Sequence, residues 1–215
     1  MPRRVSNIWS SIVHAIRRLQ SDTQRPDLWD LVVFALTLTI ANYFWKWTVT
    51  GDEGSGIVTW CGLDVSAPFQ AAAAHVTNAV FAIVSTFRDT LHQVGEYALR
   101  FDSGVGTRIV WSCTPLKQCF IWLCLILTTR TVGKKGWHKL WVIPVGWALL
   151  YGINIVRISA ITLLIEFHPE RFHVLHDYVF KYLFYGIMFG LWWLYAAFLV
   201  TPRKREQAAD VTRSE

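Results

Sequence analysis

Long apolar runs alternate with short polar segments along this chain. Four runs are long enough to cross the roughly 30 Å hydrocarbon core of a bilayer, which takes about 20 apolar residues in a helix. These runs cover residues 28–48, 109–129, 140–166 and 178–200. The third exceeds a straight crossing and contains Pro144 and Gly146, so we expect a tilt or kink there. The pattern predicts an all-α fold, a polytopic transmembrane helical bundle of about four spans.

A fifth apolar run, residues 71–87, is short and carries His75, Thr77 and Asn78. It continues to residue 100 as a stretch that is polar on one face. Basic residues, which favour the cytoplasmic side, gather in the N-terminal segment, in the 130–139 loop and in the C-terminal tail. All three groups are cytoplasmic only if residues 71–100 do not cross. We therefore expect an amphipathic or re-entrant helix on the outward side, with a five-span chain as the alternative.

The same pattern divides the chain into three parts. Residues 1–27 place several apolar side chains on one helical face beside Arg17 and Arg18, which predicts an amphipathic cytoplasmic segment on the membrane surface. Residues 28–200 form the membrane-embedded domain, and residues 201–215 form a basic, disordered cytoplasmic tail. The expected location is the cell membrane, inner or cytoplasmic, crossed several times with both termini inside.

Composition narrows the class of protein further. The chain has 215 residues, 53% of them hydrophobic, and its 12 Trp cluster near the ends of the apolar runs, as in interfacial aromatic belts. The basic residues that give the net charge of +6 lie beside these apolar runs, so membrane topology explains their positions. We therefore expect no nucleic-acid partner. The four cysteines form no CxxC pair and no Cys/His ligand spacing. We therefore expect no metal and no cofactor, and a thiol–redox role is disfavoured.

Two residues are unusual in apolar surroundings, Cys113 and Arg157. A charged side chain within a span is costly and marks a functional site by default. Asn154 lies three residues before Arg157 on the same helical face and can orient it. Cys113 stands in a Ser-Cys-Thr-Pro sequence at the expected start of a helix, where the helix dipole and Lys117 favour the thiolate. The alternatives are a structural ion pair for Arg157 and an inert buried thiol for Cys113.

Histidines precede the last apolar run. His173 and His176 lie about one helical turn apart, and either can act as a general acid or base near neutral pH. In the four-span topology, both histidines, Cys113 and Arg157 fall in the outer half of the membrane. Because these residues come from separate elements, their shared depth predicts an outward-facing Cys–Arg–His site.

At these residues the chain resembles the exosortase/archaeosortase family, polytopic membrane proteins regarded as cysteine transpeptidases. The matching pieces are the Cys motif SCTPLKQ around Cys113, the Asn-x-x-Arg motif NIVRI, and the segment HDYVFKYLFYGIMFGLWW. This last match favours His176 over His173. The family's Cys motif more often has Gly where this chain has Pro115. The resemblance covers about residues 105–200.

The resemblance implies substrates and roles. The substrates would be secreted proteins with a short recognition motif, a transmembrane helix and a basic C-terminal tail, cut near the outer membrane face. Cys113 would form a thioester, Arg157 would stabilise the oxyanion or thiolate, and His176 would protonate the leaving amine. The acyl group would pass to an acceptor nucleophile of unknown identity. The alternative is a non-enzymatic membrane scaffold or assembly factor for envelope polymer export, in which Arg157 and Asn154 hold the bundle together.

Overall fold

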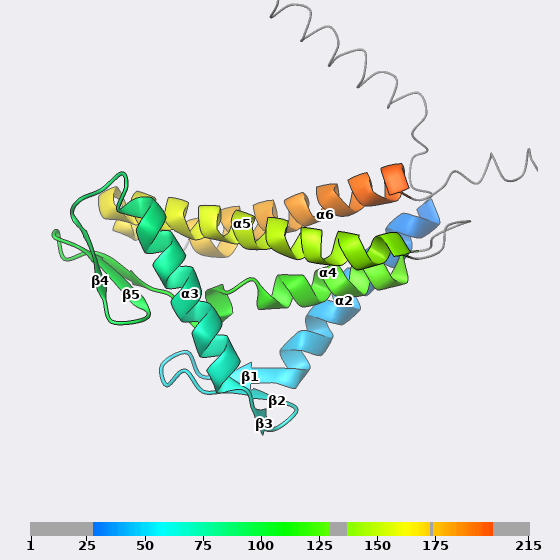
Figure 1. The fold of residues 1–215 in the computed structure, drawn as a ribbon, viewed down its shortest axis with the longest axis horizontal. Helices are drawn as coiled ribbons and strands as arrows, with labels where there is room; N and C mark the ends of the chain where they lie inside the picture. Colours follow the sequence, from blue (N-terminus) through cyan, green and yellow to red (C-terminus); the bar gives the residue numbers. More distant parts are fainter. Residues whose placement is uncertain (1–27, 130–136, 173, 200–215) are drawn as a thin grey trace, which may run out of the picture.

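The computed structural model describes residues 28–129, 137–172 and 174–199. The described chain is mostly helical and also contains two small antiparallel sheets (Figure 1). The expected amphipathic segment 1–27 and the basic tail 201–215 lie outside the described residues, as does His173.

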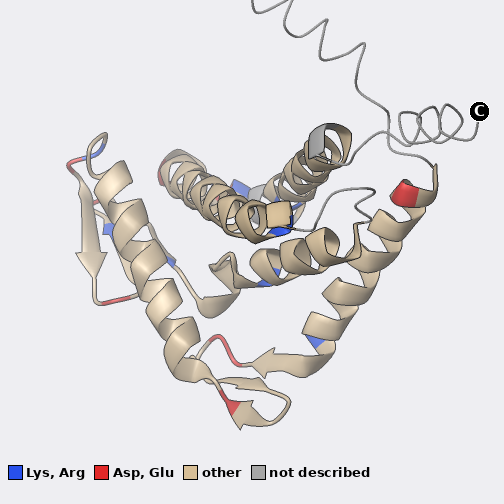
Figure 2. Cartoon of the chain, turned by 45° about the vertical axis from the view of Figure 1, so that its right-hand side comes forward, with Lys and Arg blue, Asp and Glu red and all other residues tan. Residues whose placement is uncertain are grey.

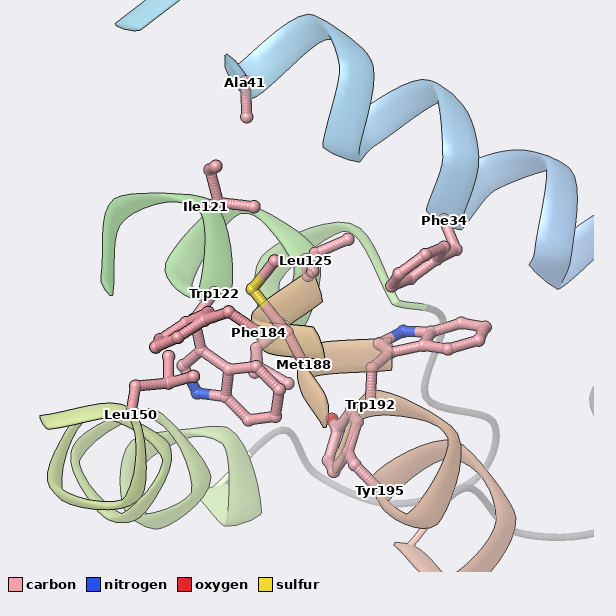
Figure 3. Close-up of a cluster of buried hydrophobic side chains, with 11 residues drawn as sticks. Phe34, Ala41, Ile121, Trp122, Leu125, Leu150, Phe184, Met188, Trp192 and Tyr195 are labelled. Atoms are coloured by element: carbon pink, nitrogen blue, oxygen red, sulfur yellow. The ribbon is translucent and has the colours of Figure 1, made fainter. Parts of the chain in front are cut away.

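Four of the helices form an elongated bundle: α2 (Leu28–Thr48), α4 (Leu116–Thr128), α5 (Trp137–Phe167) and α6 (Phe180–Leu199). In Figure 1, α4, α5 and α6 lie along the long axis of the molecule, and α2 is inclined to them. Their core is apolar and aromatic (Figure 3), with Phe34 of α2 packed on Trp192 of α6 at a ring-centroid distance of 4.5 Å. Close van der Waals packing of these side chains stabilises the bundle.

Helices α4 and α5 approach each other closely at Gly146. A Cβ at this position would collide with the indole of Trp122. The same indole N–H donates to the carbonyl of Val142 at 3.3 Å. Helix α5 continues through Pro144, which lies inside this contact region. The absence of a side chain at Gly146 therefore lets the two helices pack around the Trp122 ring.

A further helix, α3 (Ser66–Val84), lies at a steep angle to α5 and α6 near one end of the bundle (Figure 1). Two three-stranded sheets flank it. The first contains β1 (Val49–Gly51), β2 (Val58–Trp60) and β3 (Leu63–Asp64). The second contains β4 (Leu91–Val94), β5 (Ala98–Phe101) and β6 (Gly106–Arg108). Together α3 and the sheets form a cap on the bundle, whose buried core also includes Ile155 and Ile158 of α5.

The prediction of an all-α fold is wrong in this cap. Residues 71–84 are helical as expected, but the chain after Val84 turns and pairs as strands. Leu91 faces Phe101 across the β4–β5 pair, and both are buried against α3 together with Leu99. A stretch that is polar on one face fits either a helix or a strand, and packing against α3 selects the strand period of two.

The expected span at residues 109–129 is also corrected. Its helix, α4, begins only at Leu116 and has 13 residues, fewer than a straight crossing needs. Residues 111–113 instead form a 3-10 turn, η1 (Trp111–Cys113). The expected spans at 28–48 and 140–166 coincide with α2 and α5, and the last run is helical as α6.

Within the described residues, three helices are long and apolar enough to cross a membrane: α2, α3 and α5. Helix α4 is apolar but shorter. In Figure 2, acidic residues lie mostly in the loops of the cap and at helix ends, while the helices carry few charges. Length and composition therefore define the class of protein as a mostly helical membrane protein.

Candidate functional site

Cys113 lies at the junction between the cap and the bundle. It ends the 3-10 turn η1 and precedes α4 by Thr114 and Pro115, so it stands just outside the helix instead of in its first turn. Three hydrogen bonds close this turn: the Cys113 N–H donates to the Val110 carbonyl at 2.9 Å, and the Thr114 N–H and hydroxyl donate to the Trp111 carbonyl at 3.1 and 2.7 Å. The Cys113 side chain is half-buried, so it is neither fully enclosed nor fully solvated.

The turn that carries Cys113 is held from two sides. On one side, the fully buried side chain of Asn154 in α5 donates its amide N–H to the Cys113 carbonyl at 3.0 Å. On the other, the hydroxyl of Ser112 donates to a carboxylate oxygen of Glu53, in the β1–β2 loop, at 2.6 Å. The position of the thiol is thus set by α5 and by the cap together. The sequence motif singled out Asn154, but nothing near Glu53 in the sequence indicated its contact.

Arg157 lies about one turn after Asn154 on α5. It lines the same cavity as Ser112 and Thr114, which flank Cys113, and as Tyr185 of α6. The Arg157 Nε atom is buried and has no hydrogen-bond partner among the described residues. An N–H donor in such a position is available to a ligand or a reacting group.

A carboxylate on the same helix as Arg157 is engaged elsewhere. Glu166 pairs with Arg88, in the turn after α3, over 3.2 Å between Nε and Oε2. The Arg88 guanidinium also lies over the Phe167 ring, 4.8 Å from its centroid. Within the described ranges, no carboxylate pairs with Arg157. Asn154 likewise contacts the Cys113 backbone, so its hydrogen bond positions the cysteine turn.

The structure describes only the backbone of one of the two predicted histidines. His173 lies outside the described residues. The backbone of His176 lies in the π-helical turn η3 (Val174–Val179), which leads directly into α6, and its side chain lies outside the described part. The structure therefore brings together Cys113, Asn154 and Arg157, and it places the His176 backbone at the start of the helix that carries Tyr185.

A cavity of about 390 Å³ opens beside the cysteine turn. Ser112 and Thr114, the two neighbours of Cys113, line it together with Arg157. Three lysines also line it, one from each of the other bundle helices: Lys46 of α2, Lys117 of α4 and Lys181 of α6. Lys117 was singled out from its place after Cys113. Lys46 and Lys181 were missed, although each is an isolated cation in an otherwise apolar helix.

Comparison with protein-family models, with curated proteins and with solved structures finds no match for this chain. The class of protein therefore follows from its own residues, as a mostly helical membrane protein with a half-buried cysteine in a turn that borders a cationic cavity.

Proposed function

We propose that this protein is a membrane-embedded cysteine protease or transpeptidase of the exosortase-like type, acting at the outer face of the cell membrane. The observation that carries the proposal is the cavity that Arg157 shares with Ser112 and Thr114, the two neighbours of the half-buried Cys113. A cation beside a cysteine favours the thiolate, which is the nucleophilic form. The unpartnered Nε–H of Arg157 supports a second role, donation to a developing oxyanion.

The proposed reaction has two balanced steps. The Cys113 thiolate attacks the scissile carbonyl, the C–N bond breaks, and the leaving amine takes a proton from His176, which leaves a thioester. An acceptor nucleophile then gives its proton to His176 and attacks the thioester, which releases the thiolate. Arg157 balances the negative charge that passes between sulfur and oxygen in both steps. Water as acceptor gives hydrolysis, and an amine or hydroxyl gives transpeptidation or acyl transfer.

The proposed substrates are secreted proteins whose C-terminal tail has a short motif, a transmembrane helix and a basic cluster. Such a tail places its motif at the membrane surface, because the basic cluster favours the cytoplasmic side. The location of Cys113 at the junction of the bundle and the cap suits a peptide at that depth.

Thiol labelling in intact cells tests the proposal. A protein with Cys113 as its only cysteine, made by replacing Cys61, Cys119 and Cys124 with Ser, is treated with a membrane-impermeant maleimide. We expect labelling from outside, and slower labelling near pH 7 when Arg157→Ala removes the cation. A peptide with the tail architecture should also give a hydroxylamine-sensitive acyl adduct on Cys113. Labelling only from the cytoplasmic side, or a rate independent of Arg157, would refute the proposal.

A second candidate function is a non-enzymatic membrane scaffold or assembly factor for envelope polymer export. It is favoured by the bond between Asn154 and the Cys113 backbone, which joins α5 to the start of α4 irrespective of the thiol. The Cys113→Ser variant separates the two candidates, because it keeps the backbone carbonyl. An enzyme loses turnover in this variant while it folds normally, whereas a scaffold retains its function.

A further inference from the structure

We propose that the cavity beside the cysteine turn binds the phosphate of a membrane phospholipid, and that an acyl chain of the same lipid lies in an adjoining groove between α5 and α6. The inference concerns a binding site and does not depend on the proposed peptidase reaction. It rests on the charge of the cavity, on an unpartnered donor in its lining and on the apolar groove next to it.

The charge of the cavity is strongly positive. Its lining includes Lys46, Lys117, Arg157 and Lys181, one cation from each bundle helix, and no carboxylate among the described residues. Lys46, Lys117 and Lys181 line the same cavity, so their like charges are brought together there. A pair of Lys181 with Asp177, four residues earlier in the sequence, would still leave three cations unbalanced. Bringing like charges together at the end of a bundle costs free energy that a bound anion offsets.

One donor of this lining lacks a partner. The Nε atom of Arg157 is buried without a hydrogen-bond partner in the described part of the chain, and Arg157 lines the cavity. Arginine and lysine are the side chains that proteins use to bind phosphate oxygens. A volume of about 390 Å³ also falls within the range of small-molecule sites.

An apolar groove of about 440 Å³ adjoins the cavity between α5 and α6. It shares Arg157 and Phe184 with the cavity, so the two spaces lie next to each other on either side of these side chains. The rest of its lining is apolar, including Leu149, Val156, Leu183 and Ile187. The groove has open space at Gly152, where an added Cβ would meet no atom within 4 Å.

The pairing of these two spaces identifies the occupant. A free phosphate would satisfy the cations but would leave the groove empty, and an apolar chain alone would leave the cations unbalanced. A phospholipid supplies an anionic phosphate and an alkyl chain in one molecule, and the membrane presents it at high local concentration. The arrangement of the two spaces also matches a membrane lipid. The three lysines lie where α2 ends and where α4 and α6 begin, as a headgroup would require. The groove extends along the spanning helix α5, as an acyl chain would require.

Native mass spectrometry and thermal unfolding of the purified full-length protein in detergent test this inference. The probes are dioleoylphosphatidylglycerol, dioleoylglycerol, which lacks the phosphate, and inorganic phosphate. We expect the phospholipid to remain bound and to raise Tm, and dioleoylglycerol to do neither. Equal retention of both lipids would overturn the role of phosphate. Binding of inorganic phosphate that displaces the phospholipid completely and raises Tm as much would reduce the site to a free-anion site and overturn the lipid proposal.

Variants test each half of the site. Lys46→Gln with Lys181→Gln should lower phospholipid affinity at least about tenfold, which corresponds to about 1.4 kcal/mol. Gly152→Leu should weaken the phospholipid by filling the groove. The matched control is Arg171→Gln, which removes an exposed basic residue from the loop before η3 and α6, outside the cavity lining, and should leave affinity unchanged. Unchanged affinity in the double lysine variant would overturn the proposal, and the wild-type comparison of the two lipids decides it if that variant does not fold.

One further variant keeps the two proposals distinguishable. Cys113→Ser removes the proposed nucleophile and leaves every cation of the cavity in place. We expect it to retain phospholipid at wild-type affinity while it loses any peptidase activity. Activity that persists in this variant refutes the proposed function alone, whereas loss of phospholipid selectivity in the wild-type protein refutes the lipid site alone.

Discussion

The side-chain amide of Asn154 donates a hydrogen bond to the backbone carbonyl of Cys113 at 3.0 Å. This contact joins two residues that are 41 positions apart in the chain. It makes the cysteine turn an extension of α5, the helix that also carries Arg157. The helix that carries Arg157 therefore also holds one side of the cysteine turn, and the Ser112–Glu53 hydrogen bond holds the other side from the cap.

Asn154→Ala should destabilise the protein and disturb the cysteine turn. The substitution leaves the Cys113 carbonyl without its donor at a site where Asn154 is completely buried. Loss of such a bond costs about 1–3 kcal/mol. We expect a lower Tm and slower maleimide labelling of Cys113. The control is Asn78→Ala, which removes an exposed amide on α3 that accepts a hydrogen bond from Gln93; an effect of equal size there would contradict the special role of Asn154.

Arg157→Lys should lower turnover of a tail substrate while the protein folds normally. Lysine keeps the charge but lacks the planar fork and the Nε–H donor of arginine. Loss of one donor to an oxyanion typically lowers kcat about a hundredfold or more. The measurement is turnover of the tail substrate, with Tm as the folding check. Full activity in the lysine variant would show that charge alone suffices and that the Nε–H has no catalytic role.

Gly146→Ala should destabilise the packing of α4 on α5. The added methyl group collides with the Trp122 indole, and overpacking of this kind typically costs about 1–3 kcal/mol. Gly190→Ala on α6 is the matched control, because its Cβ meets nothing within 4 Å and alanine favours a helix. We expect a lower Tm for the first variant and an unchanged or higher Tm for the second. Equal Tm values would mean that α4 and α5 do not approach closely at Gly146.

The cap should weaken as the pH falls, partly through Asp64. The Ser66 hydroxyl and then the Ser66 backbone N–H donate to this carboxylate at 2.5 and 2.8 Å and hold its pKa below the ordinary value. A carboxyl whose pKa is lowered by folding stabilises the protein above its unfolded pKa of about 3.9. That stability is lost as the pH falls through the folded pKa. Ser66→Ala should raise the pKa of Asp64 toward the ordinary value, which a carboxyl NMR titration measures; an unchanged pKa would show that the Ser66 hydroxyl does not lower it.

Apolar run length by itself determined where α2 and α5 lie. A helix satisfies its own backbone hydrogen bonds, so a long apolar segment in a membrane has few alternatives to being helical. The same reasoning singled out Arg157, because a cation in an apolar run conflicts with its surroundings. The Cys113 and Asn154 motifs also came from local sequence, and the structure places both beside Arg157.

Only the tertiary structure decided the cap and the cavity. The sequence around Leu91 and Phe101 did not predict strands. These residues are in strands because the side chains on one face of β4 and β5 are buried against α3. Lys46 and Lys181 are far apart in the sequence and come together because α2 and α6 both pack on α4. Contacts between distant segments depend on how the helices pack, and an apolar run carries information about its length and its depth but little about its neighbours.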